Sequence, residues 1–176
     1  MFWLFWAGML IGGCSYKRHI KRLESAEKDH YAALRVFMKE EQKKEFLIRK
    51  TKEERDEFLK QMGIWDKFYS LSEKRREDIL NYDVKVGWNQ EELLMSWGTP
   101  YRTRLEPTSK AVQSQRWTYK FEEHYDKKKD QSYILIWEPN SKTEYKAKRV
   151  FARDVIIDDN GRPEYTDNII SEIIDR

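Results

Sequence analysis

A short helix with both of its ends encoded is visible at residues 84–100, which read VKVGWNQEELLMSWGTP. Asn89 is a favourable N-cap residue, and the two glutamates in the first turn put negative charge where it interacts well with the helix dipole. Gly98 is a typical residue just past a helix end, and Pro100 prevents the helix from continuing. We therefore predict a two-turn helix between Asn89 and Gly98.

Segments with the pattern of strands follow this helix. Residues 116–121 alternate between apolar and polar, with Trp117 and Tyr119 on the same face. Further extended segments are expected at residues 133–137 and 147–157, and residues 169–174 return as either a strand or a helix. Helices followed by an antiparallel meander form an α+β layer. The predicted fold class is therefore α+β, with a long N-terminal helix and then short helices packed on a three-stranded antiparallel sheet.

These motifs occur in a recognisable order. The chain has first Val86-Gly87-Trp88-Asn89-Gln90-Glu91-Glu92-Leu93, then Gly98-Thr99-Pro100, and last Trp117-Thr118-Tyr119. The order resembles that of the BamE/SmpA family of small outer-membrane lipoproteins, and the β-lactamase inhibitory proteins share the same repeat unit. Trp88 stands where the family usually has Met. The resemblance implies a BamE-like domain with a scaffold role, and outer-membrane β-barrel assembly is the process it suggests.

The motif residues divide into structural and exposed candidates. Gly87, Gly98 and Pro100 are expected to serve the turns, and the tryptophans are expected mainly in the core. The best candidates for contact with a protein partner are Tyr101 and Arg102, directly after the second turn, and Trp88 is a further candidate.

The first fourteen residues indicate a lipid anchor. Residues 1–13 are uncharged and apolar, and as a helix they would rise only about 20 Å, short of the roughly 30 Å of a bilayer core. Such a length is typical of a secretory signal. It ends in Ile11-Gly12-Gly13-Cys14, which resembles the lipobox of bacterial lipoproteins and implies acylation of Cys14. The alternative is a buried free cysteine after an apolar helix.

Ser15, after the cysteine, implies by resemblance to bacterial sorting rules the periplasmic face of the outer membrane. We therefore predict a lipoprotein signal peptide at residues 1–13, a lipid-anchored charged helix or stalk at 14–62, and the α+β domain at 63–176.

A charged helix is predicted from Lys17 to Met62, because this segment contains no Gly or Pro and Gly63 is a plausible stop. Half of the positions along a seven-residue seam are polar, among them Glu27, His30 and Arg55, which disfavours a long self-associating coiled coil. The helix either extends as a stalk or folds back on the domain that follows.

The remaining composition favours an interaction protein. The chain has 34 basic and 31 acidic residues, a balance that does not indicate nucleic-acid binding. Its three histidines are far apart, and no local motif for catalysis, metal or phosphate binding is present, so we predict no enzyme activity, no metal and no cofactor. The expected function is a membrane-anchored scaffold or accessory subunit of a cell-envelope complex. The alternatives are a structural lipoprotein of a motor, secretion system or pilus, and an inhibitor-like binding module.

Overall fold

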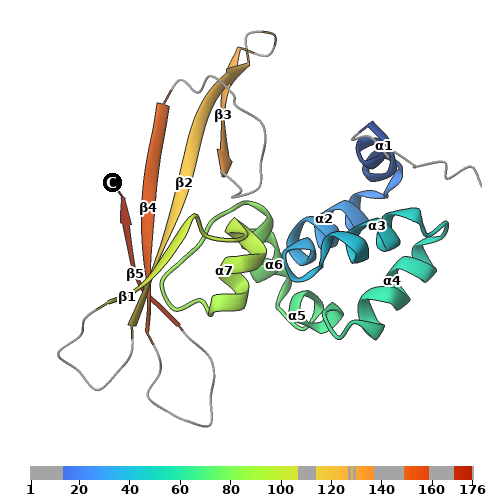
Figure 1. Cartoon of the computed structure of the whole chain (residues 1–176), viewed down its shortest axis with the longest axis horizontal. Helices are drawn as coiled ribbons and strands as arrows, with labels where there is room; N and C mark the ends of the chain where they lie inside the picture. The colour runs from blue at the N-terminus through green and yellow to red at the C-terminus, as the bar shows by residue number, and fades with distance from the viewer. Residues whose placement is uncertain are drawn as a thin grey trace, which may run out of the picture.

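A layer of helices and an antiparallel sheet form the two ends of the molecule, and one helix lies between them (Figure 1). The computed structural model describes residues 14–106, 114–126, 128, 130–136, 149–158 and 169–175. Its helices are α1 (Cys14–Arg22), α2 (Ser25–Leu34), a 3-10 turn η1 (Arg35–Phe37), α3 (Glu40–Ile48), α4 (Lys52–Gln61), α5 (Trp65–Tyr69), α6 (Glu73–Leu80) and α7 (Gln90–Trp97). Its strands are β1 (Arg102–Glu106), β2 (Ser114–Asp126), β3 (Gln131–Ile136), β4 (Arg149–Asp158) and β5 (Ile169–Asp175). The predicted α+β class is confirmed.

The sheet has five strands among the described residues, so the prediction of three was wrong. The strand order is β1-β2-β4-β5, and β3 pairs with the distal part of β2. Every pairing is antiparallel. Strand β1, with the sequence RTRLE, was missed because four of its five residues are exposed and it lacks an apolar face. An exposed edge strand of this kind carries no alternating pattern.

One face of the sheet packs on α7. The Trp97 ring lies 5.2 Å from the ring of Tyr119 and 5.1 Å from that of Phe121, both edge-on. Val155 and Ile157 of β4 are buried beside them. The predicted alternation in β2 is therefore confirmed, and it places the aromatic face of the central strand against a single short helix.

The predicted long helix was wrong, since four helices and a 3-10 turn span residues 14–61. The starts of α2, α3 and α4 are each stabilised by a side chain three residues downstream that accepts from the backbone N–H of the N-cap residue. Oε2 of Glu27 lies 2.9 Å from N of Glu24, and Oε1 of Gln42 lies 2.8 Å from N of Lys39. Thr51 caps the last of these helices, α4, through a reciprocal capping box. Such caps offset the backbone hydrogen bonds that a helix loses at a break.

The short helices fold back on the rest of the chain, so α1 to α6 form one layer, called here the helical layer. Helix α2 contacts α5, α6 and α7. Leu34, Phe46 and Leu59 come from three different helices and are each fully buried. A straight helix would leave these side chains on separate turns in water. Burying them together, at roughly 1.5–3 kcal/mol each, favours the broken arrangement. Of the two alternatives left open by the sequence, the structure shows the one in which this segment folds back.

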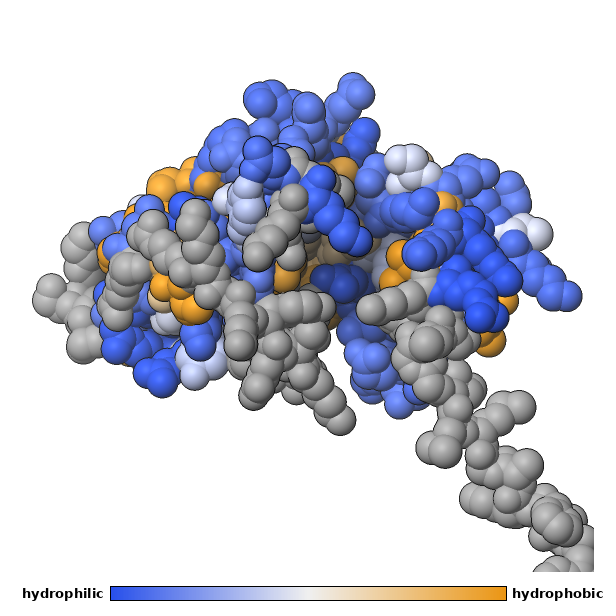
Figure 2. All heavy atoms as spheres, turned by 90° about the horizontal axis from the view of Figure 1, so that it is seen from above, coloured by the Kyte–Doolittle hydropathy of each residue, from blue (hydrophilic) through white to orange (hydrophobic). Residues whose placement is uncertain are grey.

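Gly63 ends α4 as predicted, with a positive φ of 68° and its N–H bonded to the carbonyl of Lys60 at 2.9 Å. The core is continuous across this point, so the predicted boundary at residue 63 is a helix end within one folded unit. Seen from above, hydrophilic residues cover most of the coloured surface, with smaller apolar patches between them (Figure 2).

Candidate functional site

The first motif glycine connects the helix α7 to the edge of the sheet. Gly87 has φ of +88°, a conformation that strongly favours glycine. Its N–H donates to the carbonyl of Ile170 at 2.8 Å, and the N–H of Ile170 donates to the carbonyl of Trp88 at 2.7 Å. Residues 87–88 therefore pair with β5 and cover part of its outer edge.

Trp88 belongs to the core. Only 1% of its surface is exposed, and the guanidinium of Arg75 lies 4.9 Å from its ring centroid. The side chain has no surface left for a partner in this conformation. The suggestion that Trp88 makes a partner contact is therefore corrected, since the depth of a tryptophan beside a turn depends on packing that spacing does not reveal.

The second glycine and the aromatic strand motif meet at the end of α7. Gly98 has φ of +74°, and its carbonyl accepts a hydrogen bond from the Tyr119 hydroxyl at 3.1 Å. Burial raises the pKa of Tyr119 well above its ordinary value. After Pro100, the N–H of Tyr101 donates to the carbonyl of Thr118 at 2.9 Å and starts the pairing of β1 with β2. The motif thus serves to dock the helix on the sheet.

Tyr101 and Arg102 lie on the surface, as expected. Tyr101 is 44% exposed, and Leu105 is 71% exposed. Arg102 and Arg104 are exposed along the same strand. These four residues define the β1 surface, which combines an aromatic ring, two guanidinium groups and an apolar side chain.

Cys14 is the first residue of α1. The expected signal segment at residues 1–13 lies outside the described residues, as does the Cys14 side chain. Within the part of the chain that the structure describes, no helix combines the length and the apolar character needed to cross a bilayer.

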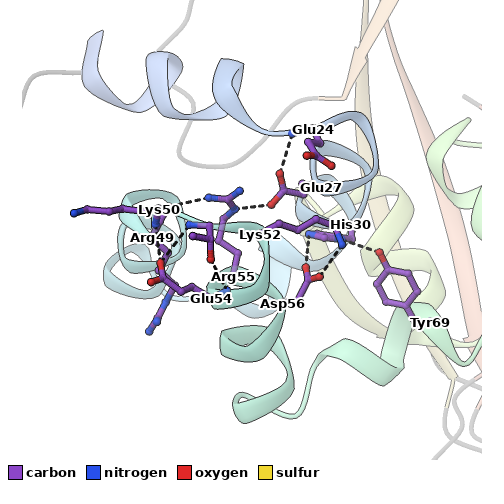
Figure 3. Close-up of polar contacts among 11 residues, drawn as sticks. Glu24, Glu27, His30, Arg49, Lys50, Lys52, Glu54, Arg55, Asp56 and Tyr69 are labelled. Atoms are coloured by element: carbon purple, nitrogen blue, oxygen red, sulfur yellow. Dashed lines mark hydrogen bonds and ion pairs between the residues drawn. The ribbon is translucent and has the colours of Figure 1, made fainter.

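The helical layer contains a buried polar cluster that the sequence did not predict (Figure 3). Glu27 of α2 is fully buried and accepts from Nε of Arg55 at 2.5 Å. The same guanidinium donates through NH1 to the carbonyl of Arg49 at 2.8 Å. A buried carboxylate needs such a partner, because an unpaired charge in the interior is strongly destabilising.

His30 forms the second half of the cluster. Its Nδ1 lies 2.8 Å from the Tyr69 hydroxyl, and its Nε2 lies 4.0 Å from Oδ1 of Asp56, too far for a direct hydrogen bond. Asp56 binds Lys52 through its other oxygen at 3.1 Å. We call Glu27, His30, Arg55, Asp56 and Tyr69 the polar cluster.

Burial and pairing set the charges of this cluster. Burial lowers the pKa of His30 below its ordinary value of 6.5, against the opposing effect of Asp56 and Glu27. Burial would raise the pKa of Glu27, but the hydrogen bond and charge of Arg55, with the backbone N–H of Glu24, bring it below 4.5. At neutral pH the cluster therefore holds an ionised Glu27 beside a neutral imidazole.

The polar cluster joins three helices and is enclosed by aromatic rings. The Phe46 and Trp65 rings pack on His30 at 6.2 and 5.7 Å. Among the described residues no group of three His, Cys, Asp or Glu side chains could hold a metal ion. The arrangement fits a role in orienting α2, α4 and α5. The one sign of the polar cluster in the sequence was the polar seam that includes Glu27, His30 and Arg55. These residues face a common interior because the predicted long helix is broken into shorter ones.

A second polar network lies on the face of the sheet opposite α7. Asp154 of β4 is fully buried; it accepts from Arg116 at 3.0 Å and from the Thr118 hydroxyl at 2.7 Å. Arg116 also pairs with Glu106 of β1. This network ties β1 to β2 and β4, and so holds the β1 surface in place.

No protein-family model, no curated protein and no solved structure matches the chain. The resemblance to the BamE/SmpA family therefore stays a prediction that rests on the motif residues.

Proposed function

We propose that the chain is a lipid-anchored periplasmic scaffold or accessory subunit of a cell-envelope protein complex, attached to the outer membrane through Cys14. The main observation behind the proposal is the abrupt change from apolar to charged sequence around Cys14. An uncharged apolar segment ends there in two glycines and a cysteine, and charged residues begin three positions later. Acyl chains on the cysteine would contribute about 0.8 kcal/mol per buried methylene, enough for stable attachment when two or three chains are present.

The position of Cys14 in the fold suits an anchor. The residue begins α1. Ile20 of that helix packs against the core, and Leu23, directly after the helix, belongs to the core. A lipid on Cys14 would thus be joined to the folded part through a short docked helix. The folded part would sit close to the membrane surface.

The β1 surface suits a protein partner. Tyrosine and arginine are enriched among residues that dominate binding energy at interfaces. Here the exposed Tyr101 directly precedes β1, and two exposed arginines lie on the strand itself. Figure 1 places β1 and α1 near opposite ends of the long axis. A molecule anchored at α1 would therefore present the β1 surface away from its attachment point, as a tether requires.

The motif order around α7 supports a role resembling that of BamE/SmpA proteins in outer-membrane β-barrel assembly. Such a role requires no catalytic residue, cofactor or metal. It is consistent with the use of the histidine, tyrosine and carboxylates of the polar cluster in helix packing.

The lipid anchor is tested by Cys14→Ala in the full chain. We expect the variant to lose the acyl mass increment seen by mass spectrometry and to leave the membrane fraction. Ser15→Ala is the matched control and should keep both properties. An unmodified cysteine in the membrane-bound wild type would refute lipidation.

The partner is tested by placing a photo-crosslinking residue at position 102 in cells. We expect a barrel-assembly subunit among the crosslinked products. The same residue at position 60, on the exposed side of α4, is the control and should not trap that subunit. Crosslinking at 102 to a motor, secretion or pilus component would instead assign the chain to that machine.

A further inference from the structure

Helix α1 carries an unusual concentration of positive charge. It contains Lys17, Arg18, Lys21 and Arg22 and no acidic residue. The formal net charge of the whole chain is +3, so removing these four charges leaves a net charge of −1 for all the rest. The four charges of this helix therefore exceed the net positive charge of the whole chain.

Several basic residues elsewhere in the helical layer form ion pairs with neighbouring carboxylates. Lys43 pairs with Glu40, Arg49 with Glu45, and Arg55 with Glu27. Arg18, Lys21 and Arg22 are exposed, and no ion pair joins them to another described residue. Uncompensated charge of one sign produces a field that reaches about one Debye length, roughly 8–10 Å at moderate salt.

The remaining side of α1 is fixed to the protein. Leu23, directly after the helix, is buried, and Ile20 packs against the core. The helix lies at the end of the molecule far from the sheet (Figure 1). The three exposed basic side chains therefore project from a docked helix, which follows the apolar residues 1–13 in the chain.

From this charge, exposure and position we infer that α1 is a docking surface for an anionic lipid bilayer, whose headgroup phosphates bind Lys17, Arg18, Lys21 and Arg22. The inference rests on the proposed membrane attachment and names the lipid class that the attached protein prefers. Basic residues next to a membrane anchor gain affinity from anionic lipids, about fivefold for each Lys or Arg near the surface. The lipid anchor and the helix would act together, because the acyl chains attach the protein to a bilayer and the basic residues add affinity for anionic headgroups.

The favourable interaction of cations with a helix C-terminus explains only part of the set of basic residues in α1. That effect is confined to the last turn, which includes Lys21 and Arg22. It does not account for Lys17 and Arg18 in the first half of the helix, nor for the absence of acidic residues there.

The test is co-flotation of the full chain with vesicles of phosphatidylcholine, alone or with one third phosphatidylglycerol. We expect at least tenfold tighter binding to the anionic vesicles at low salt, and loss of most of this preference at high salt. Replacing all four basic residues of α1 with Gln should reduce binding to anionic vesicles at least tenfold and leave binding to neutral vesicles unchanged.

The control variant carries Lys44→Gln, Lys50→Gln, Lys60→Gln and Lys74→Gln, which remove the same charge from exposed positions elsewhere in the helical layer. It should keep the preference within about a factor of two to three, because charges beyond a Debye length from the bilayer contribute little. Circular dichroism of both variants verifies that the helices remain folded.

Equal binding of the wild type to the two kinds of vesicle would overturn the inference, and so would an equal loss in the two variants. Tighter binding to a single-stranded oligonucleotide without any vesicle preference would also overturn it. If the wild-type protein carries no acyl group but still prefers anionic vesicles, only the proposed lipid anchor is contradicted. If the wild-type protein is fully acylated but does not prefer anionic vesicles, only the role of α1 is contradicted.

Discussion

In the helical layer, buried charges find their partners across three helices, whereas at the junction of α7 with the sheet aromatic rings and backbone groups meet. Glu27 pairs with Arg55 and His30 with Tyr69 in the first region. Trp97 packs on Tyr119, whose hydroxyl binds the Gly98 carbonyl, in the second. The ion pair of the first region uses acidic and basic residues, which are common along the chain, whereas the second region depends on Trp and Gly, of which the chain has seven each. This difference determines which region can be recognised in the sequence, and it predicts how each responds to mutation.

The largest effect is expected from Trp97→Ala. The substitution removes a buried ring between α7 and β2 together with its hydrogen bond to the Tyr82 carbonyl, and should lower the free energy of unfolding by about 5 kcal/mol. Urea denaturation measures the loss. Trp65→Ala is the control in the helical layer and should cost less, because Trp65 is only partly buried.

Hydrogen exchange on Trp97→Ala sharpens the comparison of the two regions. Because one continuous core joins them, protection should fall in both α2 and β2. Unchanged protection in α2 with rapid exchange in β2 would mean that the helical layer folds independently of the sheet.

A smaller loss, about 3 kcal/mol, is expected for Arg55→Met, because it leaves the Glu27 carboxylate buried without its partner. The double variant Glu27→Leu/Arg55→Met should recover most of this loss, since both charges are then gone. Urea denaturation of the two variants tests the role of the ion pair. A double variant as unstable as the single one would show that the helical layer needs the polar contacts themselves.

Gly98→Ala is expected to cost about 2 kcal/mol, since its φ of +74° and ψ of −155° are nearly restricted to glycine. An added Cβ would meet no atom within 4 Å, so the whole cost comes from backbone strain. Thermal unfolding should show a lower midpoint. A midpoint equal to that of the wild type would mean that the turn adopts another conformation at little cost.

The mildest change should come from lowering the pH. Since burial depresses the pKa of His30, the unfolded chain binds a proton more readily than the folded one. This contribution to stability is complete above pH 6.5 and is lost as the pH falls toward the depressed pKa. Denaturation of the wild type and His30→Gln at neutral and mildly acidic pH should show the decrease only in the wild type.

The same chemistry explains what could be predicted from the sequence. The helix α7 and its two ends were predicted because Asn, Gly and Pro have specific positions at helix termini, and the chain has only seven glycines. The alternation of β2 predicted its buried face. Strand β1 could not be predicted, because an exposed edge strand satisfies its backbone through β2 and needs no apolar face.

The polar cluster could not be predicted from the sequence for another reason. Glu27 is one of 31 acidic residues, and its place in the polar seam does not by itself distinguish it from those that face solvent. The capping box of Thr51 with Glu54 was a local signal for a break in the predicted long helix, and it was not used. Once that break is present, Arg55 turns toward α2 and the cluster forms.

The sequence by itself determined the helix α7, the turns at Gly87 and Gly98 and the aromatic face of β2, because these follow from backbone preferences and from short-range alternation. Only the tertiary structure decided that the charged segment folds into a layer, that Trp88 is buried, and that Glu27 and His30 meet Arg55 and Tyr69. Those outcomes depend on burying apolar side chains from distant helices together. The free energy gained there exceeds the modest preference of an uninterrupted sequence for one long helix.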